Sequence, residues 1–161
     1  TDPDMADLCD ETGVGVVIMH MQGNPRSMQS DPTYGDVVAD VAAFLRDRTA
    51  AAIERGIEAS RIVVDPGIGF GKTFDHNLAL LGAIDELGGG QPVLVGTSRK
   101  SFLGTILEHA GRPSAPSDRD TATAATVALA VAAGAAVVRV HNAAGAVDAA
   151  RTADAIVRVH E

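Results

Sequence analysis

Short apolar runs alternate along this chain with longer stretches in which apolar residues recur every three or four positions. Continuous β-branched runs are typical of strands buried on both faces, whereas spacings of three and four indicate one buried face of a helix. The short runs predict four strands, at Val14–Met19, Ile62–Val64, Pro92–Val95 and Ala135–Val140.

Helices are predicted before, between and after these strands. The first is capped by Asp2-Pro3-Asp4 and runs to about Glu11, and the others cover residues 36–55, 75–87, 101–110, 120–133 and 144–159. In the second helix one face carries Val37, Val41, Phe44, Leu45, Ala51, Ala52 and Ile53. In the third helix the apolar residues at helical spacing are Leu78, Leu81, Ile84 and Leu87. Helix 120–133 is rich in alanine, which permits close packing on a sheet or on a partner subunit.

Two long segments contain the breakers glycine and proline and are predicted as loops. Residues 20–34 form a polar loop, and residues 111–119, with two prolines and two serines, are expected to form a mobile surface loop.

The order αβαβαβαβα predicts parallel strands with right-handed crossovers. Two architectures fit it, an open doubly wound sheet and the second half of a (βα)8 barrel. Polar residues follow every strand, and a barrel gathers all strand ends at one mouth, whereas an open sheet has one switch point. We therefore favour a single domain, residues 1–161, with about four βα units of a (βα)8 TIM barrel.

The length agrees with part of a barrel, because 161 residues compare with about 250 in a whole one. The chain begins with Thr1-Asp2-Pro3, without an initiator methionine. We expect the natural amino terminus, and the first half of the barrel, to lie upstream.

Composition narrows the function. The chain is 46% hydrophobic with a mean hydropathy of +0.13, enough for a substantial core. A net charge of −8 and an isoelectric point of about 5.0 argue against a general nucleic-acid binder. The single cysteine, Cys9, is compatible with a reducing cytoplasm. The apolar runs are shorter than the roughly 20 residues of a membrane span, so no membrane association is expected.

The segment Ile62–Thr73 combines a strand, an acid and a glycine-rich loop. It ends in Gly-Lys-Thr, but Pro66 stands where a nucleotide-binding P-loop begins with glycine, which argues against that motif. Asp65 follows the strand directly. It is either a turn or capping residue, or a ligand whose two carboxylate oxygens pair with N–H donors of a planar heterocycle.

Two further strand ends carry cations. The segment Gly96–Ser101 places Arg99, Lys100 and two serines before a helix, where backbone N–H groups can hold a carboxylate or phosphate. The alternative is a capped helix with solvated charges. Arg139 and His141 alternate on the last strand, and a buried Arg139 requires either a bound anion or an internal ion pair.

Other candidates have simpler interpretations. The histidines without ligand-like spacing are interpreted as structural or exposed, namely His20, His76, His109 and His160. Met19 and Met21 are most simply core residues, although Met19 could form the floor of a pocket.

One barrel mouth would thus hold Asp65, Lys100, Arg139 and His141, with Phe70 beside them. This set suits a flat polar ring and an anionic leaving group. It contains no obvious pair of nucleophile and base, so it indicates a substitution assisted by electrostatics.

Four motifs, in the same order and with similar spacing, resemble bacterial dihydropteroate synthase. They are residues 19–25 (Met-His-Met-Gln-Gly-Asn-Pro), 65–72 (Asp-Pro-Gly-Ile-Gly-Phe-Gly-Lys), 96–101 (Gly-Thr-Ser-Arg-Lys-Ser) and 139–141 (Arg-Val-His). The resemblance implies a (βα)8 barrel, usually homodimeric. It also implies a transferase of folate biosynthesis that joins 6-hydroxymethyl-7,8-dihydropterin pyrophosphate to p-aminobenzoate and releases pyrophosphate.

The resemblance also implies roles for single residues. Asp65 and Lys100 would hold the pterin, with Met19 lining its pocket and Gly96 in the same substrate-binding set. Arg139 and His141 would bind the pyrophosphate and, with Lys100, form the catalytic group. Ser101 would receive the p-aminobenzoate carboxylate, against Phe70. The family reaction passes through a pterin cation with help from Mg²⁺, and sulfonamide drugs occupy the p-aminobenzoate position.

Two departures from the family pattern matter. The chain would begin in the helix before the fifth strand, so the Asn that helps to bind Mg²⁺, two mobile loops and further pterin ligands are missing. No metal ligand is therefore expected in this chain, and the chain alone is expected to be inactive. Where the family usually has Asp after Arg-Val-His, this chain has Asn142, which removes a charge near the anion site.

Two alternatives remain beside the synthase. The first is a related pterin-binding methyltransferase domain. Such domains lack the Ser-Arg-Lys-Ser segment that this chain contains, which argues against this alternative. A non-catalytic paralogue, or a half-barrel that binds pterin or only associates with itself, is favoured by Asn142. A half-barrel has two open sheet edges, so self-association is expected in either case.

Overall fold

The computed structural model describes residues 4–160, with the side chain of His160 left out. The cap predicted at Asp2-Pro3 and the interpretation of His160 lie outside the described part. Helix α1 (Met5–Thr12) ends at Gly13, which adopts the left-handed conformation that terminates helices (φ 69°).

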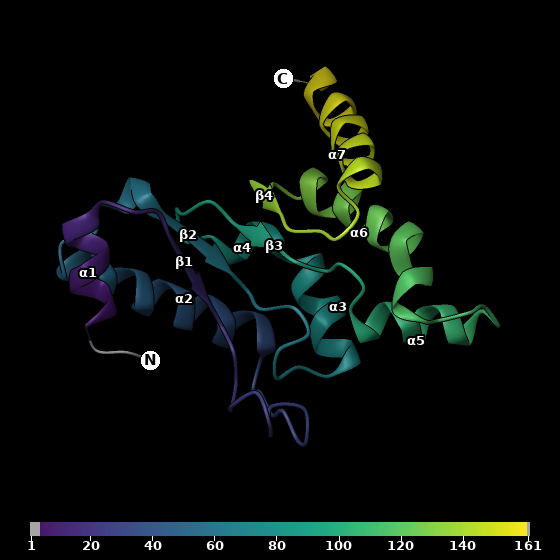
Figure 1. Cartoon of the computed structure of the whole chain (residues 1–161), viewed down its shortest axis with the longest axis horizontal. Coiled ribbons are helices and arrows are strands. Elements are labelled where there is room, and N and C mark those ends of the chain that lie inside the picture. Colours follow the sequence, from purple (N-terminus) through teal and green to yellow (C-terminus); the bar gives the residue numbers. More distant parts are fainter. Residues whose placement is uncertain (1–3, 161) are drawn as a thin grey trace.

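Four short parallel strands form the centre of the fold, in the order β1-β2-β3-β4 (Figure 1). Strand β1 (Val16–Met19) pairs with β2 (Ile62–Asp65), and β3 (Leu94–Val95) pairs with β4 (Val137–Val138). A single bridge between Val64 and Val93 joins the two pairs. The predicted parallel order is confirmed, but the strands predicted at 14–19, 92–95 and 135–140 were too long.

The helices follow the predicted alternation. After β1 comes α2 (Val37–Glu54), and a 3-10 turn η1 (Ala59–Arg61) leads into β2. After β3 comes α5 (Ser101–His109), then the 3-10 turn η2 (Pro116–Arg119) within the predicted loop 111–119, and α6 (Asp120–Ala132). The chain continues through α7 (Ala143–Val157) to the 3-10 turn η3 (Arg158–His160).

The helix predicted over residues 75–87 is two helices, α3 (Phe74–Gly82) and α4 (Ile84–Leu87). The break lies at Ala83, whose φ of −130° is not helical. Leu80, Ile84 and Leu87 are all buried, whereas the predicted core residue Leu78 is 40% exposed. The buried residues therefore lie on two helices that change direction at Ala83, and not on one apolar face of a single long helix.

The core lies between the strands and the helices on one side of them. Figure 1 shows α2 along β1 and β2, and α6 beside α7 next to β4. Val41 and Leu45 of α2 pack against Ile62 and Val64 of β2, and all four are at most 1% exposed. The predicted buried face of α2 is confirmed as far as Leu45, but Ile53 near the end of the helix is 43% exposed.

The other face of the strands is more open. Val17 of β1 is 52% exposed, and Val63 of β2 is only half-buried. The prediction that β2 is buried on both faces is therefore wrong for Val63. Within residues 4–160, no helix is both long enough and apolar enough to cross a membrane.

Candidate active site

The carboxyl ends of the four strands lie at one edge of the fold, as the sequence predicts. Asp65 is the last residue of β2, and Met19 is its partner across the β1–β2 ladder. Met19 is 39% exposed, so its interpretation as a core residue is wrong. It lies beside Asp65, where it can line a pocket.

Asp65 is a half-buried carboxylate with one short internal contact. Its Oδ1 accepts a hydrogen bond from the Gly67 N–H at 2.7 Å. Burial raises the pKa of Asp65 above its ordinary value, while the Gly67 N–H and nearby cations oppose that shift. The cations are Lys100, Lys72 and Arg139. The site therefore concentrates positive charge around one acid.

The loop after β2 packs directly on the segment after β1. The backbone of Gly67 (φ 68°) lies so close to the carbonyl oxygen of His20 that a Cβ atom would be 1.8 Å from it. Gly71 (φ 63°) approaches the Gln22 carbonyl in the same way. Tyr34 Oη donates to the Gly71 carbonyl at 2.7 Å. Glycine is therefore required where the two loops meet.

Lys72 and His20 form a buried contact inside this pair of loops. The Lys72 ammonium donates to Nδ1 of His20 at 3.0 Å and to the Phe70 carbonyl at 3.0 Å, and Lys72 is only 3% exposed. Such a lysine is turned inward, unlike the phosphate-facing lysine of a P-loop. Burial lowers the pKa of Lys72 to about 8.

Burial and the neighbouring Lys72 ammonium lower the pKa of His20 from 6.5 to about 4. Between these values the unfolded chain binds a proton that the folded chain does not, so stability falls as pH falls through this window. We expect a loss of up to about 3 kcal/mol. Urea unfolding at pH 7 and pH 4.5 measures it.

The matched variant is His20→Gln, which keeps an acceptor for Lys72 but cannot titrate. The difference in unfolding free energy between the two pH values is expected to shrink in this variant by most of that amount. An equal difference in wild type and variant would show that His20 does not carry the effect.

Lys100 and Phe70 meet at the centre of the site. The Lys100 Nζ lies 3.7 Å from the centroid of the Phe70 ring, a cation–π distance. Burial, followed by Arg139, lowers the pKa of Lys100, while the Asp65 carboxylate opposes that effect. Gly96 is half-buried at the end of β3, and Ser101 is the exposed first residue of α5.

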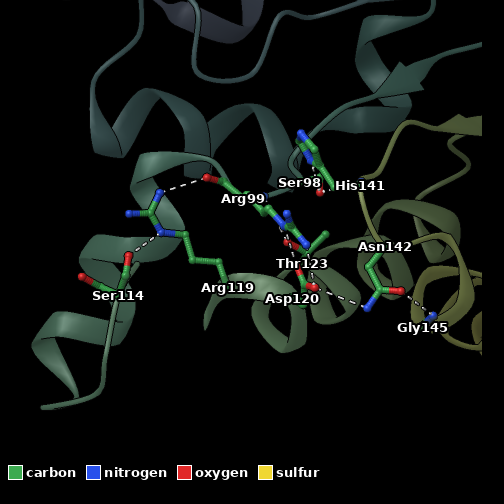
Figure 2. Close-up of polar contacts among 9 residues, drawn as sticks. All are labelled: Ser98, Arg99, Ser114, Arg119, Asp120, Thr123, His141, Asn142 and Gly145. Carbon is green, nitrogen blue, oxygen red and sulfur yellow. Dashed lines mark hydrogen bonds and ion pairs between the residues drawn. The ribbon is translucent and has the colours of Figure 1, made fainter. Parts of the chain in front are cut away.

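Arg139 and His141 reach the same edge in a different way from the prediction. Strand β4 ends at Val138, so a strand alternation does not orient them, and Arg139 is exposed rather than buried. The His141 N–H donates to Ser98 Oγ at 3.0 Å, and His141 Nδ1 lies 2.8 Å from the same oxygen (Figure 2). An exposed Arg139 needs no internal ion pair and is accessible to an anion.

Sequence reasoning missed the contact between Lys72 and His20 and the contact between Ser98 and His141. The chain contains only two lysines, Lys72 and Lys100, and both act electrostatically on Asp65. That rarity was the available signal for Lys72. His20 directly follows a strand, as Asp65 ends one, which was the signal for His20.

The residues present do not form a metal site by themselves. Among residues 4–160, no three His, Cys, Asp or Glu side chains gather closely enough to hold a metal ion. The cations around Asp65 would also oppose a metal there.

Comparison with known proteins places the chain in a family. The family model described as "Pterin binding enzyme" matches residues 1–141. Dihydropteroate synthase of Mycobacterium leprae is 45% identical over 158 residues, which cover 96% of this chain and 55% of that protein. The chain spans about half the length of the bacterial relatives it matches.

Two solved structures agree in fold. Yersinia pestis dihydropteroate synthase with a sulfonamide drug has a TM-score of 0.92 and 34% identity, covering 100% of this chain and 57% of that one. Xanthomonas albilineans dihydropteroate synthase with 4-aminobenzoic acid has a TM-score of 0.85 and 40% identity, covering 96% and 54%. The four βα units are therefore part of a (βα)8 barrel, and the chain belongs to the pterin-binding enzyme family.

Proposed function

We propose that this chain supplies the carboxyl-terminal part of a dihydropteroate synthase active site. The enzyme joins 6-hydroxymethyl-7,8-dihydropterin pyrophosphate to p-aminobenzoate in folate biosynthesis. The observation that carries the proposal is the placement of Lys100 over the Phe70 ring, within the electrostatic reach of Asp65. An acid, a cation and an aromatic ring at one strand edge suit a flat heterocycle beside an aromatic amine.

Asp65 and Lys100 bind the pterin ring in this proposal. An ionised carboxylate accepts two hydrogen bonds from adjacent N–H groups, and an ammonium donates to ring oxygen or nitrogen. Asp65 already engages Gly67 through one oxygen, which fixes the direction of the carboxylate. Met19, its ladder partner, lines the pocket on one side, and Gly96 leaves room at the end of β3.

Arg139 and His141 bind the pyrophosphate as it leaves. The bond between the pterin methylene carbon and the pyrophosphate oxygen breaks, and that oxygen keeps the electron pair. The amine nitrogen of p-aminobenzoate then bonds to the same carbon and releases one proton to water. Cations stabilise the charge that develops on the leaving oxygen, and the exposed Arg139 can approach it.

p-Aminobenzoate binds at the start of α5. Ser101 is the first residue of this nine-residue helix, where backbone N–H groups and a hydroxyl can hold a carboxylate. Phe70, already in contact with Lys100, supplies an aromatic face for the aminobenzoate ring. We expect sulfonamides to compete at the same position.

Mg²⁺ is part of the proposal only as a group held elsewhere. The resemblance to the family implies that its ligands lie in the length of the relatives that this chain does not span. When bound, the metal would add positive charge for the pyrophosphate. The roles of Lys100, Arg139 and His141 do not depend on it.

Activity requires the remaining half of the site, and this can be measured. The chain alone is expected to incorporate no p-aminobenzoate into dihydropteroate. Addition of the amino-terminal half of the Mycobacterium leprae relative is expected to restore incorporation with the wild-type chain and not with Lys100→Ala. Incorporation by the chain alone, or equal incorporation with Lys100→Ala, would contradict the proposal.

We also propose that the chain associates with a second copy of itself through α6 and α7. A groove of about 440 Å³ lies between these helices, and its lining is almost entirely apolar. Leu129 and Ile156, which line it, are 68% and 66% exposed. Apolar surface of this kind is commonly covered by a partner.

Light scattering measures the association. The wild-type chain is expected to be dimeric or larger, and Leu129→Asp is expected to shift it to a monomer. The matched control is Ile53→Asp, which adds the same charge at an exposed apolar residue of α2. A wild-type monomer, or equal behaviour of both variants, would refute this interface.

A further inference from the structure

Arg99 has an unusual backbone conformation in the segment that leads to Lys100. Its φ is 59°, and among residues 4–160 it is the one residue other than glycine with a positive φ. The Lys100 N–H donates to the Thr97 carbonyl at 3.1 Å, so Arg99 is the third residue of a tight turn. A positive φ at that position normally selects glycine. Another residue type keeps a positive φ only where the surrounding structure holds it.

Three different groups of Arg99 are held by Arg119, the last residue of η2, and by Asp120 and Thr123 of α6 (Figure 2). The Asp120 carboxylate accepts two hydrogen bonds from the Arg99 guanidinium, from Nε at 2.8 Å and from Nη2 at 3.1 Å. Thr123 Oγ1 accepts from the Arg99 backbone N–H at 3.2 Å, and Arg119 Nη1 donates to the Arg99 carbonyl at 2.9 Å. We call Arg119, Asp120 and Thr123 the Arg99 clamp.

The clamp is itself fixed to its surroundings. Arg119 Nε donates to the Ser114 carbonyl at 2.7 Å. Its guanidinium lies against Gly104 of α5, where a Cβ atom would approach within 2.7 Å. The hydrogen bond from Arg99 lowers the pKa of Asp120, so its carboxylate stays ionised at neutral pH. A two-point ion pair of this geometry restricts orientation as well as distance.

The residues on either side of Arg99 are those of the candidate site. Ser98 contacts His141, and Lys100 lies over Phe70. We propose that Asp120, acting through Arg99, is the positioning residue that directs Lys100 to the pterin and Ser98 to His141. The identity of the ligand in this proposal rests on the proposed function, whereas the positioning of Lys100 and Ser98 does not.

Asn142 extends the clamp to α7. Its Nδ2 donates to Asp120 Oδ2 at 3.3 Å, and its Oδ1 accepts from the Gly145 N–H at 3.3 Å as the cap of α7. An aspartate at this position could cap the helix but could not donate to Asp120, and two carboxylates would face each other. The amide at residue 142 therefore matches the carboxylate at residue 120.

Lysine resonances test the clamp without any ligand. Because Lys72 and Lys100 are the only lysines, ¹³Cε-labelled lysine gives two signals, assigned with Lys100→Arg. The Phe70 ring current is expected to shift the Lys100 signal upfield. Asp120→Asn should abolish that shift and leave the Lys72 signal unchanged. Asn142→Asp should reduce the Lys100 shift by a smaller amount.

A rescue variant separates positioning from general damage. Glycine adopts a positive φ without a clamp, so Asp120→Asn combined with Arg99→Gly is expected to recover the Lys100 shift. The control is Asp47→Asn, an exposed acid of α2. Where Asp120→Asn does not fold, Arg99→Gln removes the two-point pairing, keeps the number of lysines at two and gives the same readout. An unchanged Lys100 signal in the folded variant, or no recovery with Arg99→Gly, would overturn the proposal.

Ligand binding adds a separate arm. Asp120→Asn is expected to weaken the binding of pterin pyrophosphate roughly tenfold, because a small misplacement of Lys100 is costly. Equal affinities of wild type and variant would overturn the role in pterin positioning. If wild type does not bind pterin pyrophosphate, the proposed function fails, while the lysine resonances still decide whether Asp120 positions Lys100.

Discussion

Replacing Gly67 with alanine is expected to lower the free energy of unfolding by about 3–5 kcal/mol and to disrupt the candidate site. Two costs combine. The φ of 68° is unfavourable for alanine, and the new Cβ would lie 1.8 Å from the His20 carbonyl oxygen. That oxygen belongs to the backbone, and His20 N–H is bonded to the Asp65 carbonyl at 2.9 Å. Relief would therefore have to separate β1 and β2 where they meet the site.

Gly89→Ala is the matched control for this prediction. Gly89 also has a positive φ, 55°, but nothing lies within 4 Å of a Cβ built there. It carries the backbone cost alone, about 1–2 kcal/mol. Urea unfolding of both variants measures the difference. Equal losses in the two proteins would mean that the contact between the two loops contributes little.

Replacing Asp65 with asparagine is expected to weaken the binding of pterin pyrophosphate about 100-fold, or about 2.7 kcal/mol. The amide oxygen can still accept from the Gly67 N–H, as Asp65 Oδ1 does at 2.7 Å. The second atom becomes a donor that faces the N–H donors of the pterin. The fold should be kept, because burial already disfavours the charged form of Asp65 and raises its pKa.

Calorimetric titration measures this affinity. Asp47→Asn, on the exposed side of α2, makes the same chemical change away from the site and is expected to bind like wild type. Thermal unfolding of Asp65→Asn verifies that the fold is intact. An affinity equal to that of Asp47→Asn would remove Asp65 from the pterin site.

The strand ends could be predicted because their signals are local. Three apolar residues followed by Asp65 place an acid at the end of β2, and the parallel order brings that end next to the others. The same logic placed Lys100 and Ser101 after β3. The side-chain contacts of Lys72 could not be read in this way, because its partner His20 is 52 residues away.

The errors have physical causes. A continuous helical pattern does not reveal that Ala83 changes direction so that Ile84 and Leu87 can both be buried. The alternation of Arg139 and His141 predicts a longer strand than β4, which ends at Val138. Directly after it, the Arg139 N–H still donates to the Val95 carbonyl at 3.0 Å, but Arg139 is outside the strand and remains exposed. Sequence patterns indicate which residues are buried and which element they belong to, but tertiary contacts decide where that element ends or changes direction.

Arg99 illustrates a further limit. The motif Ser-Arg-Lys-Ser indicates anion binding, and Arg99 looks like a candidate ligand in the sequence. In the fold its guanidinium is engaged by Asp120, which lies 21 residues later. Its positive φ is not encoded by a glycine, so only the structure reveals that it supports Lys100.

The most direct test of the central claim, that this chain carries a pterin-binding site around Asp65 and Lys100, is a titration of pterin pyrophosphate into the chain and its Lys100→Ala variant. We predict saturable binding by wild type and none by Lys100→Ala at the same concentrations, with both proteins folded. Absence of binding by wild type, or equal binding by both proteins, would contradict the claim.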